Sequence, residues 1–220
     1  MGNIDWLFFD MGGTLIDESR QEEAIAQALV AGCARFGLSY TTDDVFTALR
    51  EGSERYEQPV PYAIGKLART GEQAAALRAA GRYLPELEVP FPDAAATLEQ
   101  LARRYRLGII ANQSSGAEER LRGHGLHRYF SVFALSAELG LHKPDPAIFR
   151  AALAAAGCDA MHAAYIGDRL DNDIAPAKAL GFATVRVLQG VGRYQVPRSP
   201  AYQPDYTIGS LGELISLFLP

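Results

Sequence analysis

The sequence predicts an α/β protein, with a doubly wound, Rossmann-like parallel sheet as its core and an all-helical cap inserted into that core. From residue 91 onward, short apolar runs alternate with helical periodicity, which is typical of a parallel sheet covered on both faces. One further apolar run lies near the N-terminus, and a purely helical pattern follows it. We therefore assign residues 1–16 and 90–220 to the α/β core and residues 17–89 to the helical cap.

The N-terminal part of the chain predicts one strand and then the cap helices. Residues 4–9, "IDWLFF", are apolar and end at Asp10 and a glycine pair, as a buried strand that leads into a turn would. "TTDD" at 41–44 is a helix-start signal, whereas "QPVP" at 58–61 and "LPELEVPFP" at 84–92 interrupt the helical pattern. The expected cap helices cover residues 19–36, 42–57, 62–69 and 72–84.

The C-terminal part predicts alternating helices and strands. The strands are expected at residues 105–111, 131–135, 163–167, 182–188 and 205–209. The helices are expected at residues 93–104, 116–123, 145–156, 171–180 and 211–218. Residues 189–206 are rich in Gly, Pro and Tyr, and we interpret them as a surface loop packed by its own tyrosines.

Composition and charge argue against several classes of protein, among them nucleic-acid-binding, membrane-spanning and disulfide-rich proteins. The 220 residues are 48% hydrophobic and 21% charged with a net charge of −5, so neither nucleic acid nor an anionic membrane surface is an expected partner. No apolar run reaches membrane-spanning length. Cys33 and Cys158 have no His/Cys cluster around them, which fits a cytoplasmic protein without a disulfide framework or zinc site. The lysines are Lys66, Lys143 and Lys178, and the other basic residues are arginines.

Polar and charged residues follow the predicted strands where those strands end. Asp10 follows the first strand, "ANQSSG" at 111–116 follows the second, and "GDRLDND" at 167–173 follows the fourth. "LHKPDPAIF" at 141–149 adds Lys143. Because ligands of doubly wound sheets bind outside the carboxyl ends of the strands, we expect these segments to converge on one site.

These residue types suit phosphate chemistry. Carboxylate oxygens are the ligands that Mg²⁺ prefers, and a lysine can hold a phosphate oxygen and an aspartate together. Free backbone N–H groups in a strand-end loop bind anions. A carboxylate in such a site can attack phosphorus and form an aspartyl-phosphate.

"FFDMGGTLID", "HKPDPAIF" and "GDRLDNDI", in this order, resemble the motifs of the haloacid dehalogenase-like hydrolase superfamily, and the helical insertion resembles its type-1 cap. The resemblance covers the whole chain. It implies a Mg²⁺-dependent phosphate-ester hydrolase that acts on a small phosphorylated metabolite. It also implies that Asp10 is the nucleophile and a metal ligand, that Lys143 steadies the nucleophile and the phosphate, and that Asp168 is a metal ligand. By the same resemblance Asp173 is a supporting acid and Thr14 shapes the turn.

Two positions depart from the family pattern. Gly12 stands where the family's phosphatases carry a second aspartate, so the usual proton donor and acceptor is absent, an effect of typically ~10²–10⁴-fold in rate. Gly12 keeps the backbone carbonyl, which in the family ligates the metal. Ala111 stands where the family has a Ser or Thr that binds phosphate. Asn112, Gln113 and Ser114, with nearby N–H groups, are the remaining candidates for phosphate binding, although a serine here is equally suited to capping the next helix.

Three alternatives stay open from the sequence. A non-catalytic phosphate- or metabolite-binding homologue would explain the losses at Gly12 and Ala111. A 2-haloacid dehalogenase also lacks the second acid, but that branch needs no metal. A phosphonate hydrolase would use a cap lysine as a Schiff base, for which Lys66 is the candidate. Asp171 is interpreted as a helix-start charge rather than a ligand.

Overall fold

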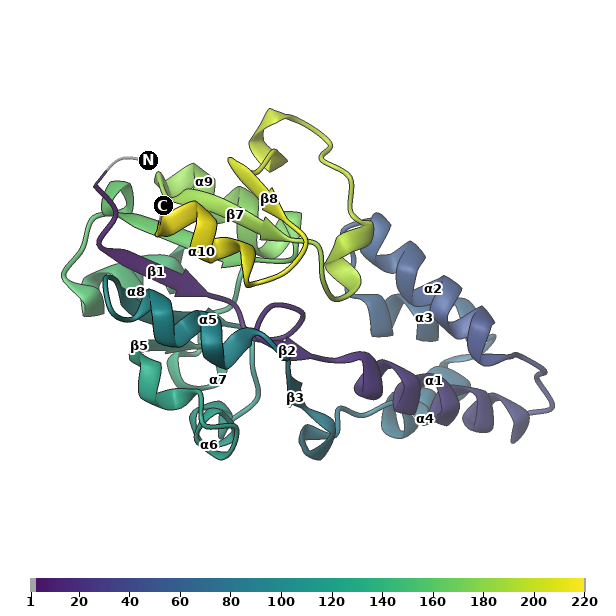
Figure 1. Ribbon diagram of the computed structural model, residues 1–220. Coiled ribbons are helices and arrows are strands. Elements are labelled where there is room, and N and C mark those ends of the chain that lie inside the picture. Colours follow the sequence, from purple (N-terminus) through teal and green to yellow (C-terminus); the bar gives the residue numbers. More distant parts are fainter. Residues whose placement is uncertain (1–2, 220) are drawn as a thin grey trace. The chain divides into compact units, whose positions relative to one another are not determined.

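The apolar runs that the sequence predicts as strands form a six-stranded parallel sheet in the computed structural model, which describes residues 3–219 (Figure 1). The order across the sheet is β5-β4-β1-β6-β7-β8. The strands are β1 (Trp6–Phe9), β4 (Arg106–Ala111), β5 (Phe130–Leu135), β6 (Ala163–Gly167), β7 (Ala183–Val187) and β8 (Tyr206–Ile208). The predicted α/β class with a parallel, Rossmann-like sheet is therefore confirmed.

β1 lies at the switch point of this sheet. The chain builds outward from β1 through β4 to β5 and then returns to the other side of β1 with β6. Trp6 of β1 is in register with Arg106 of β4 and with Ala163 of β6, so the three strands run side by side. Their carboxyl ends consequently meet at the edge where such sheets bind ligands.

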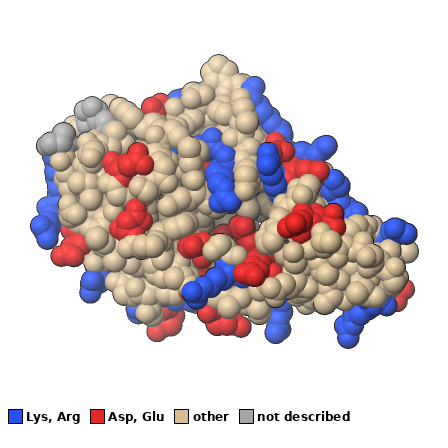
Figure 2. All heavy atoms as spheres, turned by 45° about the vertical axis from the view of Figure 1, so that its right-hand side comes forward, with Lys and Arg blue, Asp and Glu red and all other residues tan. Residues whose placement is uncertain are grey.

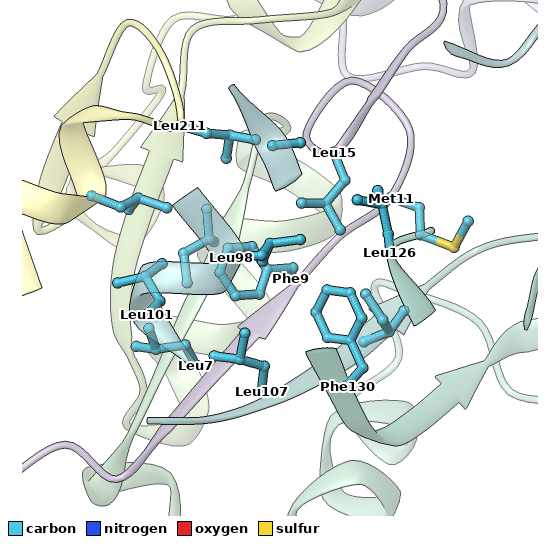
Figure 3. Packing of buried hydrophobic residues seen from close by; sticks show 14 of the residues in the cluster. Leu7, Phe9, Met11, Leu15, Leu98, Leu101, Leu107, Leu126, Phe130 and Leu211 are labelled. Carbon is cyan, nitrogen blue, oxygen red and sulfur yellow. The ribbon is translucent and has the colours of Figure 1, made fainter. Parts of the chain in front are cut away.

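Alternate residues of β1 supply two separate cores. Leu7 and Phe9 point to one face, where Figure 3 shows them among Leu98 and Leu101 of α5 (Ala94–Leu101). Trp6 and Phe8 lie in the cluster on the other face. Because side chains of a strand alternate between faces, a strand that is apolar throughout needs helices on both sides.

The helices of the core cover these two faces. The helices are α5 (Ala94–Leu101), α6 (Ala117–Gly123), α7 (Ser136–Leu139), α8 (Pro146–Ala156), α9 (Ala175–Leu180) and α10 (Glu213–Phe218). α5, α6 and α10 contribute to the cluster that contains Leu7, whereas α8 and α9 contribute to the cluster that contains Phe8. Short 3₁₀ turns lie at Pro85–Leu87, His127–Tyr129, Ala160–His162, Val191–Tyr194 and Pro200–Tyr202, and a π-helical turn at Leu170–Ile174 precedes α9.

The cap is a separate helical unit with its own core. Its helices are α1 (Ser19–Ala34), α2 (Thr42–Glu54), α3 (Pro59–Leu67) and α4 (Gly71–Ala80). Apolar residues of all four pack into one buried cluster that includes Leu29, Leu49, Ile64 and Leu77. Thr41 caps α2 in a capping box with Asp44, as "TTDD" predicts.

The helix break predicted at residues 58–61 is wrong, because α3 begins at Pro59. The first turn of a helix leaves its N–H groups without intrahelical partners, so prolines are tolerated there. "QPVP" is therefore the start of a helix rather than an interruption.

The chain passes between the two units at a short antiparallel pair, β2 (Ile16–Asp17) with β3 (Val89–Pro90). The core unit comprises the chain up to Asp17, Val89–Arg193 and the chain from Pro197, and the cap unit comprises Glu18–Glu88 together with Tyr194–Val196. The predicted boundaries of 17–89 differ by one residue at each end, because β2 and β3 pair within the core. The three residues Tyr194–Val196 were not expected in the cap.

Charged side chains of both signs are mixed on the face drawn in Figure 2, where neither sign forms a continuous patch among the described residues. Within residues 3–219, no helix combines the length and the apolar character that crossing a bilayer requires.

Candidate active site

Three carboxylates gather at the carboxyl end of β1 and β6. Asp10 follows β1 directly and Asp168 follows β6 directly, while Asp173 lies in the π-helical turn that comes next. The Asp10 N–H donates to the carbonyl of Ile166 at 2.9 Å, which extends the pairing of the two strands to the catalytic edge. A ligand oxygen from each of the three carboxylates lies within 4.8 Å of the others.

Lys143 pairs with two of these carboxylates. Its Nζ lies 2.7 Å from Oδ1 of Asp10 and 2.6 Å from Oδ1 of Asp173. The side chains of Lys143 and Asp173 are 2% and 0% exposed, whereas that of Asp10 is 13% exposed. Of these three groups, Asp10 is therefore the one that a substrate can reach.

Tyr165 is a site residue that the sequence analysis missed. Its hydroxyl accepts from Nζ of Lys143 at 3.0 Å and donates to the carbonyl of Ile110 at 2.8 Å, and it lies 3.2 Å from Oδ1 of Asp173. Burial raises the pKa of Tyr165 well above its ordinary value, so the phenol keeps its proton. The signal in the sequence was a polar-tipped residue in the otherwise apolar run "AAYIG", two positions before "GD".

The charges in the cluster are unbalanced, because it contains three carboxylates and one ammonium. Burial raises the pKa of Asp10 to about 6; the charge of Lys143 opposes this shift and the charge of Asp173 adds to it. Burial alone lowers the pKa of Lys143, but Asp10 and Asp173 outweigh it, so its pKa lies above the ordinary value. Lys143 is therefore a permanent cation, and the excess of negative charge favours a further cation.

This donor set fits a magnesium ion. Hard carboxylate oxygens in close proximity are what Mg²⁺ prefers, and a buried excess of negative charge is unfavourable unless a cation compensates it. Asp10 and Asp168 would hold the ion, with the backbone carbonyl of Gly12 as the third protein ligand that the family resemblance implies. Asp173 is already paired with Lys143, an arrangement compatible with the supporting role that the family resemblance implies.

Asp173 is fixed from both sides of its carboxylate. Its Oδ2 accepts the N–H of Arg169 at 2.9 Å, while Oδ1 binds Lys143. A Cβ on Gly167 would lie 2.6 Å from Cβ of Asp173, so only glycine permits this approach. Asp171 pairs with the guanidinium of Arg169 at 2.6 Å in the first turn after β6, in line with its interpretation as a helix-start charge.

A tight turn follows Asp10. The carbonyl of Met11 accepts the N–H groups of Thr14, Leu15 and Ile16 at 3.2, 2.8 and 2.9 Å. Gly13 adopts φ = +67°, and a Cβ there would lie 2.8 Å from Oδ2 of Asp168, so the glycine is required by both conformation and space. Thr14 is buried, and its Oγ1 has no hydrogen-bond partner within residues 3–219.

The loop after β4 is arranged differently from the sequence-based expectation. Asn112 Nδ2 donates to the carbonyl of Lys143 at 2.9 Å and its Oδ1 accepts the Lys143 N–H at 2.7 Å. The Asn112 amide is thus used to position Lys143, and a phosphate contact by this side chain would break that pair. Ala111 is fully buried at the end of β4.

The next residues are also tied to the protein, with one exception. The backbone N–H of Gln113 donates to the hydroxyl of Ser136 at 2.9 Å, and its side-chain Oε1 accepts from Arg120 at 2.9 Å. Ser114 is exposed, and the helix cap that follows is Gly116, which makes no side-chain cap. Among the predicted phosphate ligands, Ser114 and the loop backbone fit that role better than the Asn112 amide does.

The cap lysine does not have the environment of a Schiff-base lysine. Lys66 pairs with Glu51, and its hydrogen bond to that carboxylate raises the pKa of Lys66. A Schiff base requires the neutral amine, so this pair disfavours a phosphonate hydrolase.

Residues 4–181 match the family of haloacid dehalogenase-like hydrolases, and the chain belongs to that family. It is 39% identical over 130 residues to a glyceraldehyde 3-phosphate phosphatase of Methanocaldococcus jannaschii, a match over 58% of this chain and 56% of that relative. It is 29% identical over 225 residues to the phosphatase of the same name from Methanopyrus kandleri, covering 97% of both chains. The HAD-hydrolase YfnB of Bacillus subtilis, whose crystal structure is bound to magnesium, shares the fold with a TM-score of 0.75 at 22% identity, covering 98% of both chains.

Proposed function

We propose that this haloacid dehalogenase-like hydrolase is a Mg²⁺-dependent phosphate-ester hydrolase that acts on a small phosphorylated metabolite through an aspartyl-phosphate on Asp10. The observation that carries the proposal is the cluster of Asp10, Asp168 and Asp173, in which the buried ammonium of Lys143 pairs with Asp10 and Asp173. The two relatives named as glyceraldehyde 3-phosphate phosphatases support a substrate of that size and charge.

The residues divide the reaction between them. An oxygen of Asp10 attacks phosphorus, the P–O ester bond breaks, and the leaving oxygen takes a proton from water. Water then attacks the phosphorus of the aspartyl-phosphate, which releases inorganic phosphate and restores the carboxylate. Lys143 stays charged throughout and stabilises negative charge next to Asp10. A bound Mg²⁺, held by Asp10, Asp168 and the Gly12 carbonyl, would neutralise charge on the phosphate and on the carboxylates.

Gly12 limits which esters can react quickly. With no carboxyl group at this position, the leaving oxygen lacks its usual proton donor, which typically contributes ~10²–10⁴-fold. Leaving groups of low basicity, such as those of acyl and aryl phosphates, need that proton least. We expect these classes to be the better substrates.

A phosphate-release screen with and without Mg²⁺ tests the proposal. We expect Mg²⁺-dependent release by the wild type and none by Asp10→Asn, since the amide oxygen is a poor nucleophile. Gly12→Asp should raise the rate on a simple aryl phosphate by about 10²-fold, because it supplies the missing acid. Asp17→Asn is a matched control, because it removes a carboxylate of the same N-terminal segment that lies outside the three-carboxylate cluster.

Two outcomes would favour the alternatives. Mg²⁺ binding without turnover in either the wild type or Gly12→Asp would favour a non-catalytic phosphate-binding protein, which the losses at Gly12 and Ala111 also suit. Chloride release from a 2-haloacid without any metal would favour a dehalogenase. The three-carboxylate cluster argues against the second of these, because without a metal its excess of negative charge has no compensating cation.

A further inference from the structure

The segment Gln189–Val196 lies against the carboxylate of Asp168. The N–H of Gly192 donates to Oδ2 of Asp168 at 3.0 Å. A Cβ on Gly192 would lie 2.3 Å from that oxygen, and a Cβ on Gly190 would lie 2.7 Å from Cα of Gly13. The segment therefore approaches so closely that only glycines fit at these two positions. This contact lies in the loop that the composition predicts at residues 189–206.

Arg186 of β7 holds this approach in place. Its side chain is buried, although arginine is rarely buried unless it is paired. Nη2 donates to the carbonyl of Gly192 at 2.7 Å, and Nε donates to the carbonyl of Asp168 at 3.3 Å. The guanidinium of Arg186 thus binds two backbone carbonyls. One belongs to Asp168, the predicted metal ligand, and the other to Gly192, whose N–H donates to the Asp168 carboxylate. This arrangement fixes the orientation of the Asp168 carboxylate.

The other end of the same segment belongs to the cap. Gln195 is buried there and donates through Nε2 to the carbonyl of Ser53 at 3.2 Å. The hydroxyl of Tyr56 donates to the carbonyl of Val196 at 2.9 Å, and the guanidinium of Arg50 lies 5.0 Å from the ring centroid of Tyr194.

Tyr56 also has an uncommon backbone conformation. Its φ is +65°, and among residues 3–219 it is the one non-glycine residue with positive φ. Such a conformation persists only where the surroundings enforce it. In the cap this tyrosine makes the contact that holds Val196.

From these contacts we infer that Arg186 and the segment Gly190–Val196 position Asp168 for the metal and make that position depend on the cap. A single residue, Arg193, separates Gly192 on Asp168 from Tyr194 in the cap. So short a connection transmits a displacement of the cap anchor to the hydrogen bond on Asp168. The inference rests on the proposed function, since it gives the cap a means of adjusting the metal site.

The test compares two double variants of the cap, neither of which alters the metal site. Arg50→Ala/Tyr56→Phe removes two contacts that anchor the segment. Arg55→Ala/Tyr62→Phe removes a cation–π pair and a tyrosine hydroxyl contact of the same unit, and leaves Arg50 and Tyr56 intact. The readouts are Mg²⁺ affinity by calorimetry and hydrogen exchange of the Gly192 amide in the metal-free protein.

We expect the anchor variant to weaken Mg²⁺ binding about 5-fold, at the lower end of typical coupling between sites, and to speed exchange of the Gly192 amide by a similar factor. The control variant should change neither. Arg186→Met should weaken Mg²⁺ binding about 10-fold, as removal of a residue that orients a metal ligand does, and Arg186→Lys should restore part of the loss.

Equal Mg²⁺ affinity and equal Gly192 exchange in the anchor and control variants would overturn the inference. The metal-free exchange also separates this failure from failure of the proposed function. If the wild type binds no Mg²⁺, the proposed function fails, and the exchange of the Gly192 amide alone still decides whether the cap anchor controls Asp168.

Discussion

The candidate site has two regions that are built in different ways: one at the ends of β1 and β6, and one in the loop after β4. Between β1 and β6, Asp10, Lys143 and Asp173 hold one another through short charged contacts. After β4, the side chains of Asn112 and Gln113 bind protein groups instead, and Ala111 offers no hydroxyl. The comparison teaches that Asp10 and Lys143 are held by charge, whereas under the proposed function phosphate binding would depend largely on Lys143 and the loop backbone. Changes in the first region should be severe, and changes in the second should be graded.

The largest expected effect comes from Lys143→Met. It leaves Asp10 and Asp173 without their ammonium, so we expect the free energy of unfolding to fall by about 3–5 kcal/mol in urea denaturation. Phosphate release should fall about 10³-fold, because the charge beside the nucleophile is lost.

Lys178→Met is the matched control for this change. Lys178 pairs with Asp205 at 2.7 Å, but both side chains are about one-third exposed, so its loss should change stability by less than about 1 kcal/mol. If the two substitutions lower the free energy of unfolding by similar amounts, the ion pairs of Lys143 contribute no more to stability than a surface ion pair does.

The second-largest effect is expected from a substitution at the end of β4, in the region without a side-chain hydroxyl for phosphate. Ala111→Ser would supply the hydroxyl that the family resemblance implies at this position. A hydrogen bond to a charged phosphate is worth about 1.5–3 kcal/mol, so kcat/KM on an aryl phosphate should rise about 10-fold. Ala111→Cys, which has a similar size but is a weak donor, should give no such gain. A loss of stability without a gain in activity would place residue 111 outside the phosphate site.

The fold was predictable from the sequence because its signals are local. Apolar runs such as "AAYIG" and "LGIIA" give strands, and the positions of Asp10 and Asp168 directly after two of them give the site. Lys143 was predictable because it is a rare lysine between two breaks in the pattern.

The missed features depend on contacts between segments far apart in the chain. The use of the Asn112 amide depends on the backbone of Lys143, 31 residues away. The role of Arg186 depends on two carbonyls, and nothing in "ATVRV" signals them. Glycine composition indicated that residues 189–206 form a loop, but not that Gly192 is required by its approach to Asp168.

The third prediction uses the pKa of Asp10, which burial raises to about 6 in the metal-free protein. Below that pH the carboxyl group holds a proton that Mg²⁺ must displace, and above it the carboxylate is ready to bind. Mg²⁺ affinity should therefore rise with pH, by up to about 10-fold per unit below pH 6, and level off above it. Calorimetry between pH 5 and 8 measures this profile. Asp10→Asn should bind more weakly and lose the dependence, and a profile that it shares with the wild type would assign the titration to another group.

The smallest effect tests whether the charged cluster of Asp10, Lys143 and Asp173 also depends on a neutral side chain of the sheet. Tyr165→Phe keeps the ring, and with it the edge contacts to Phe149 and Phe182, but removes the hydroxyl that joins Lys143 to the carbonyl of Ile110. Two buried groups then lose a partner, so the free energy of unfolding should fall by about 1–3 kcal/mol. Phosphate release should fall only a few-fold, because Asp10 and Asp173 still hold the ammonium. Urea denaturation with and without Mg²⁺ measures the first effect and steady-state kinetics the second. An unchanged free energy of unfolding would show that the Tyr165 hydroxyl does not stabilise the cluster of Asp10, Lys143 and Asp173. A loss of activity as large as that of Lys143→Met would show that Tyr165 is as necessary as the lysine itself.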